Sequence, residues 1–151
     1  MYLDGEGGTG KSEVIKAVTE MFQILNKSEL LKKVAYTGAA ASNIDGVTLA
    51  YLFDQQRNER KEEEETTVSM GRLDRLTKKI GEKIEMIIVD EVSMTSPSKW
   101  ATWDGHLRQV AKAHKIFGGV HMLFVGDFLQ YPPVGQHALF ESISNNTISK
   151  M

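Results

Sequence analysis

The stretch Gly5-Glu6-Gly7-Gly8-Thr9-Gly10-Lys11-Ser12 decides the fold of this chain. It fits the pattern G-x-x-x-x-G-K-[ST], whose glycines let the backbone curl so that its N–H groups point toward phosphate oxygens. Apolar residues stand just before it, and apolar side chains follow it at helical spacing. We therefore expect a strand that ends near residue 3 and a helix from about Lys11 to Leu25, whose positive N-terminal end favours an anion.

The loop predicts a site for a nucleoside triphosphate with magnesium. In this pattern Lys11 reaches the β- and γ-phosphates, and the Ser12 hydroxyl ligates Mg²⁺. Average residue frequencies give about 0.006 chance matches in a chain of this length, so a glycine-rich turn without a ligand is a poor explanation. The predicted nucleotide-binding residues are Gly5, Gly7, Gly8, Thr9, Gly10, Lys11 and Ser12.

A second segment, Ile87-Ile88-Val89-Asp90-Glu91, is an apolar strand that ends in two acids. Ligands of parallel sheets bind at the carboxyl ends of the strands, where the glycine-rich loop also lies. Asp90 is placed to hold the magnesium shell, and Glu91 to orient and deprotonate an attacking water. Two adjacent acids favour hydrolysis over simple binding.

A third apolar strand ends in Gly126-Asp127-Phe128-Leu129-Gln130. Gln130 is a candidate to contact the γ-phosphate. For Asp127 two roles stay open, because it either pairs with a base or caps the loop.

The rest of the chain alternates between strand and helix patterns, which predicts an α/β domain with a parallel sheet flanked by helices. We expect this domain over residues 1–143, with a solvated loop at 55–67 and a polar tail at 144–151. Further strands are expected at 34–36, 84–89 and 121–125. Further helices are expected to begin at Gly38 and at Ser96-Pro97 and to span the apolar face from Met70 to Ile80.

The amino-acid composition restricts the kinds of binding site and the cellular location that can be expected. The net charge is −2, from 18 basic and 20 acidic residues, so any nucleic-acid contact must come from a local surface. Cysteine is absent, which excludes disulfides and thiolate metal sites. No apolar run approaches the roughly 20 residues of a membrane span, and an intracellular location is expected. The two tryptophans are expected in the core rather than in a base-stacking surface, and the four histidines are expected to be structural or surface residues rather than metal ligands. These residues are Trp100, Trp103, His106, His114, His121 and His137.

The segments in this order resemble the Pif-type DNA helicases of superfamily one, group B. Within that group the sequence looks most like the helicase portion of Helitron-type mobile elements. The likeness extends from residue 1 to about 143. It rests on the following segments: Asp4 to Ser12, Thr37-Gly38-Ala39-Ala40-Ala41-Ser42-Asn43-Ile44-Asp45-Gly46-Val47-Thr48-Leu49, Asp90-Glu91-Val92-Ser93-Met94, and Gly126-Asp127-Phe128-Leu129-Gln130-Tyr131-Pro132-Pro133-Val134.

The resemblance implies a RecA-like P-loop domain and an ATP-driven motor that moves 5′ to 3′ on single-stranded DNA. It implies that Gln130 couples the γ-phosphate to the DNA-bound state. It also implies that Thr37, Gly38 and Asn43 face the DNA, through backbone amides and hydroxyls rather than net positive charge. Roles in DNA repair, recombination and telomere maintenance follow from the family, in a nucleus or mitochondrion if the source is eukaryotic.

Such helicases need a second motor domain that closes the cleft and supplies arginines to the transition state. We therefore expect this chain to be the first motor domain of a helicase, which binds ATP weakly, hydrolyses it slowly and does not unwind DNA alone. Two alternatives stay open. One is a degenerate nucleotide-binding module, which Ala50 and Tyr51 favour because they stand where the family has His-Ser. The other is a phosphoryl-transfer enzyme acting on a small substrate.

Overall fold

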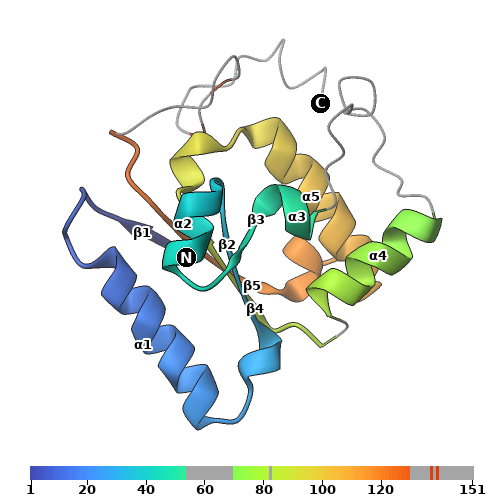
Figure 1. Cartoon of the computed structure of the whole chain (residues 1–151). Coiled ribbons are helices and arrows are strands. Elements are labelled where there is room, and N and C mark those ends of the chain that lie inside the picture. Colours follow the sequence, from blue (N-terminus) through green and yellow to red (C-terminus); the bar gives the residue numbers. More distant parts are fainter. Residues whose placement is uncertain (54–69, 82, 130–136, 138, 140–151) are drawn as a thin grey trace.

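The computed structural model describes residues 1–53, 70–81, 83–129, 137 and 139. Its elements are, in chain order, β1 (Tyr2–Asp4), α1 (Lys11–Ile24), η1 (Ser28–Leu30), β2 (Leu31–Ala35), α2 (Gly38–Asn43), β3 (Val47–Thr48), α3 (Leu49–Leu52), α4 (Met70–Ile80), β4 (Met86–Asp90), η3 (Val92–Met94), α5 (Pro97–Ala111), η4 (Ile116–Gly119) and β5 (His121–Gly126). The strands form one sheet in the order β1-β5-β4-β2-β3, and each neighbouring pair is parallel. The predicted α/β fold with a parallel sheet is confirmed (Figure 1).

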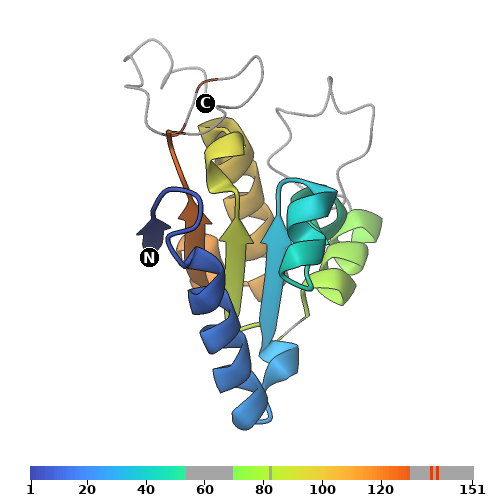
Figure 2. The same cartoon turned by 60° about the vertical axis from the view of Figure 1, so that its left-hand side comes forward.

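Helices cover both faces of this sheet (Figure 2). One apolar cluster joins α1 and α2 to the sheet, and it contains Ile15 and Ile88. A second cluster joins α3, α4 and α5 to the opposite face, and it contains Ile87 and Val89. Successive residues of β4 thus enter opposite clusters, which explains why a strand buried on both faces reads as a continuous apolar run.

The first predicted helix and the helix after Ser96 are confirmed, with small differences at their ends. The strand expected at 84–89 begins two residues later, at Met86. Glu85 already bonds on both sides, because its N–H donates to O of Leu30, the residue before β2, at 2.9 Å and its carbonyl accepts from His121 N of β5 at 2.9 Å. The difference therefore lies in where regular pairing begins rather than in the path of the chain.

The second strand differs more from its prediction. It runs over Leu31–Ala35, whereas the expectation was 34–36, and Tyr36 lies just beyond it. Lys32 and Lys33 interrupt the apolar pattern by which a buried strand is recognised in the sequence. Both nevertheless pair in register with β4, opposite Ile87 and Ile88. The predicted loop at 55–67, the limit at 143 and the tail at 144–151 lie outside the described residues.

The two tryptophans belong to the core, as predicted. Trp103 stacks on Phe53 with ring centroids 4.9 Å apart, and Trp100 meets Trp103 edge-on at 4.8 Å. The Trp100 indole N–H donates to Thr95 Oγ1 at 2.7 Å, so its polar atom is satisfied inside the cluster. His106 is also buried, whereas His114, His121 and His137 are exposed.

Candidate nucleotide-binding site

The glycine-rich loop connects β1 to α1 in the way the motif requires. Gly10 precedes the helix in the left-handed region, at φ 93°, where a side chain would be strained. A Cβ at Gly5 would lie 2.5 Å from Thr9 Oγ1, so the turn closes only around a glycine. Thr9 stabilises the loop by a hydrogen bond within it, because its hydroxyl donates to Glu6 O at 2.8 Å. The result is an exposed loop whose backbone is bent tightly at the helix N-terminus.

Lys11 extends its ammonium group across this loop. Its Nζ donates to the carbonyl oxygen of Gly5 and to that of Glu6, the latter at 2.7 Å. The positive charge therefore lies among the backbone groups that the motif assigns to phosphates. Its influence reaches β4, since the lysine is one of the charges that act on the Asp90 carboxyl.

Asp90 and Glu91 stand at the carboxyl end of β4, as predicted. Burial raises the pKa of Asp90, and so does the nearby charge of Glu91; the Glu91 N–H and the Lys11 charge lower it. Asp90 Oδ1 accepts the Glu91 N–H at 2.9 Å, and Glu91 itself adopts left-handed angles, φ 54° and ψ 40°. Partial burial disfavours the charged form of this carboxylate, and a bound cation would offset that desolvation free energy.

The donor set fits Mg²⁺ better than a metal held by protein alone. Magnesium usually keeps several waters and takes one or two protein oxygens beside the phosphates of a substrate. Asp90 offers such a carboxylate, and Ser12 offers a hydroxyl in the first turn of α1. Within the described ranges, no group of three or more His, Cys, Asp or Glu is placed to hold a metal ion.

Thr37 and Gly38 follow β2 at the start of α2, whereas Asn43 lies at the other end of that helix. Thr37 caps α2, because its hydroxyl accepts the Ala40 N–H at 3.2 Å. Gly38 begins that helix and Asn43 ends it, roughly 8 Å farther along at 1.5 Å per residue. Thr37 also donates to Glu91 Oε2 at 2.9 Å, a contact that the sequence pattern did not predict.

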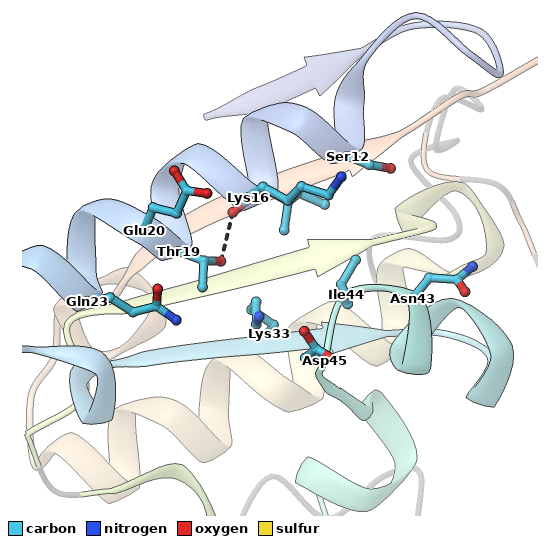
Figure 3. Close-up of a pocket in the computed structure, with 10 residues that line it drawn as sticks. Ser12, Lys16, Thr19, Glu20, Gln23, Lys33, Asn43, Ile44 and Asp45 are labelled. Atoms are coloured by element: carbon cyan, nitrogen blue, oxygen red, sulfur yellow. Dashed lines mark hydrogen bonds between the residues drawn. The ribbon is translucent and has the colours of Figure 1, made fainter.

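Asn43 lines a pocket between α1 and α2 with a volume of about 210 Å³ (Figure 3). Ser12 lines the same pocket from the first turn of α1, and Lys33 lines it from β2. Among the described residues, no hydrogen bond joins Ser12 to Asp90. Through Ser12 the pocket adjoins the C-terminal end of the phosphate loop.

The third segment is described only in part. Asp127 is buried, and its Oδ1 accepts the Leu129 N–H at 2.9 Å, so of its two predicted roles it caps the loop. Gln130 lies outside the described residues. Among the helices of the described part, none is long and apolar enough to cross a membrane.

Comparison with known proteins decides the family. The family model for PIF1-like helicase matches residues 1–151. The chain belongs to the PIF1-like helicase family. The ATP-dependent DNA helicase PIF1 of Saccharomyces cerevisiae is 30% identical over 145 residues, which cover 90% of this chain and 16% of that protein. The helicase PIF7 of Trypanosoma brucei brucei is 30% identical over 139 residues, which cover 91% of this chain and 14% of that protein.

Solved PIF1-type structures share the fold. Bacteroides Pif1 bound to single-stranded DNA matches with a TM-score of 0.67 and 32% identity, over 90% of this chain and 30% of that one. Pif1 of Bacteroides sp in complex with ADP-AlF4 matches with a TM-score of 0.65 and 32% identity, over 89% and 30% respectively. The predicted RecA-like fold is thereby confirmed. This PIF1-like chain spans about a sixth of the length of the yeast relative.

Proposed function

We propose that this chain is the nucleotide-hydrolysing motor domain of a DNA helicase. In the proposal, the backbone from Gly5 to Gly10 and the Lys11 ammonium bind the phosphates of ATP. Ser12 and Asp90 hold Mg²⁺, which stabilises the charge that develops on the transferred phosphoryl group. Glu91 takes the proton of the attacking water.

One observation carries this proposal. The phosphate loop follows β1 and Asp90 ends β4, and both strands pair in parallel with β5, so the loop and the carboxylate lie at the same edge of the sheet. A phosphate-binding cation and a magnesium-binding carboxylate are therefore near enough to serve one Mg²⁺–nucleotide complex. The named contacts of the PIF1-type neighbours, with ADP-AlF4 and with single-stranded DNA, support the same ligands here.

For the longer protein we propose 5′-to-3′ movement on single-stranded DNA and duplex unwinding, together with the family's roles in repair, recombination and telomere maintenance in a nucleus or mitochondrion. That activity requires a second motor domain as partner, whose arginine stabilises the transition state and is worth several orders of magnitude in rate. Thr37, Gly38 and Asn43 are proposed DNA contacts, and Gln130 is the proposed γ-phosphate sensor. The isolated chain should hydrolyse ATP slowly and should not separate strands.

The experiment is magnesium-dependent ATP hydrolysis by the purified chain, with and without single-stranded DNA. Lys11→Ala should abolish hydrolysis, whereas Lys27→Ala, in the turn after the far end of α1, should leave it at the wild-type rate. Stimulation by DNA that Lys11→Ala abolishes supports the coupled motor, and a parallel reaction with single-stranded RNA measures the preference between the two.

Two results would contradict the proposal. Hydrolysis that survives Glu91→Gln unchanged would favour the degenerate nucleotide-binding module. Hydrolysis stimulated by a small metabolite and not by nucleic acid would favour a phosphoryl-transfer enzyme. ATP binding without hydrolysis in any condition would contradict the expected slow hydrolysis and would mean that hydrolysis needs the second motor domain.

A further inference from the structure

The contact between Thr37 and Glu91 follows from the order of the strands. β2 and β4 are neighbours, and Ala35 pairs with Asp90 in register. Thr37 therefore stands two residues beyond the end of one strand and Glu91 one residue beyond the pair position on the other. Residues 54 apart in the sequence meet at the edge of the sheet where the proposed chemistry takes place.

The Thr37 hydroxyl takes part in two hydrogen bonds and has no second proton to donate. It accepts the Ala40 N–H at 3.2 Å, which caps α2, and it donates its one proton to Glu91 Oε2 at 2.9 Å. Both bonds are partly buried, so water competes for them less than at an open surface. Among the described residues, no hydrogen bond reaches the other Glu91 oxygen, Oε1.

The Glu91 backbone is held as well. Its left-handed angles are unusual for a residue with a side chain and strain the backbone at this position. The Glu91 N–H is bound to Asp90 Oδ1, so the main chain has little freedom and the side chain is oriented by Thr37. Backbone strain that persists beside a carboxylate of this kind is typical of functional positions.

We propose that Thr37 is a positioning residue for Glu91, which it orients by one hydrogen bond while leaving Oε1 available to a water. The proposal rests on the proposed role of Glu91 as the general base. A base oriented by a third group is the usual arrangement in enzymes that activate a nucleophile. The bond also ties the catalytic carboxylate to the first turn of α2.

The single proton of Thr37 has a consequence for the expected DNA contact. A phosphate oxygen only accepts hydrogen bonds, and the hydroxyl already donates to Glu91. A phosphate that takes the Thr37 proton therefore releases Glu91, whereas a phosphate held by the backbone N–H of this turn leaves the carboxylate in place. DNA bound through the Thr37 hydroxyl and an oriented Glu91 exclude each other.

The test compares Thr37→Val, which has the same shape without the hydroxyl, with Thr37→Ser, which keeps it. Without DNA, Thr37→Val should lower kcat about tenfold or more, the typical effect of losing a hydrogen bond to a charged group, and leave the KM for ATP within about twofold. Thr37→Ser should restore most of the rate. In a Glu91→Gln background, Thr37→Val should have no further effect on the residual rate, because the group it orients has already lost its function.

Thr48→Val is the matched control for loss of a helix cap. Thr48 caps α3 by accepting the Tyr51 N–H at 3.1 Å, and no carboxylate binds it among the described residues. It should keep the wild-type DNA-free rate. An unchanged kcat in Thr37→Val, or the same loss with and without Glu91, would overturn the positioning role.

A second measurement does not need hydrolysis. With ¹³C-methyl-labelled threonine, Glu91→Ala should shift the Thr37 methyl resonance and leave that of Thr48 in place. If the Thr37 resonance does not move, the proposal is wrong even in an active enzyme. If it moves but the wild type shows no Lys11-dependent hydrolysis, the contact stands and the proposed function fails instead. This readout also decides the case if Thr37→Val does not fold.

Discussion

Replacing His106 with leucine should remove a large part of the acid sensitivity of this domain. The side chain is 1% exposed, and its ring lies 6.5 Å from that of Phe53 between α3 and α5. Burial, together with the smaller effect of the Arg72 charge, lowers its pKa from 6.5 to about 4. The folded state therefore keeps the imidazole neutral, and its Nδ1 has no hydrogen-bond partner among the residues that the structure describes.

The sign and size of the effect follow from linkage. Because the folded pKa is below the unfolded one, the unfolded chain binds the extra proton, and stability falls as the pH drops from above 6.5 toward 4. With these two pKa values, the loss between pH 7 and pH 5 is about 2 kcal/mol from this one residue. That is a large share of the stability of a typical domain, which is about 5–15 kcal/mol.

The assay is urea unfolding at pH 7 and pH 5, followed by the fluorescence of the buried tryptophans. The wild type should lose about 2 kcal/mol more than His106→Leu over this interval. His121→Gln, a change at an exposed histidine, should keep the wild-type dependence. Equal losses in wild type and His106→Leu would refute the reasoning, as would an NMR titration that places the pKa of His106 near 6.5.

Three further predictions concern other positions. Asp90→Asn keeps an oxygen that accepts the Glu91 N–H and removes a carboxylate whose pKa is raised by burial. In metal-free buffer near pH 7 this substitution should therefore raise the melting temperature by about 1–2 °C, and ATP with Mg²⁺ should no longer stabilise the protein. A lower melting temperature would contradict this. Gly46→Ala should destabilise by about 1–3 kcal/mol in urea titrations, since its Cβ would lie 2.4 Å from a carbonyl oxygen of β2, whereas Gly71→Ala in α4 should be neutral or stabilising. Trp100→Phe should cost about 1–3 kcal/mol by the same titration, because it leaves the buried Thr95 hydroxyl without the indole donor, and a change below the error of the titration would show that the bond is unimportant.

The elements that could be predicted are those whose physics is local. The phosphate loop specifies its own backbone, so the start of α1 at Lys11 followed from the glycines and the lysine alone. The apolar run of β4 could only be a strand covered on both sides. Pro97 after Ser96 marked the first residues of α5, which the structure confirms.

The elements that could not be predicted depend on partners far away in the chain. β2 begins with Leu31-Lys32-Lys33, and its first residues form a strand because β4 lies beside them, which leaves both lysines half-buried. The two-residue strand β3 exists only as a partner of β2. In each case tertiary pairing overrode a weak local signal.

The candidate site shows the same division between what a motif specifies and what topology adds. Each motif identifies its candidate residues because the chemistry of glycines, a lysine and paired acids at this spacing can be inferred without knowing the fold. None of them stated which strand lies beside which. In the observed order β5 separates β1 from β4, and β2 borders β4 on the other side. The end of β2 therefore meets Glu91 rather than the phosphate loop, and Thr37 becomes a partner of the catalytic carboxylate. Had β2 lain beside β1, the same threonine would have adjoined the phosphate loop, with no change in any motif.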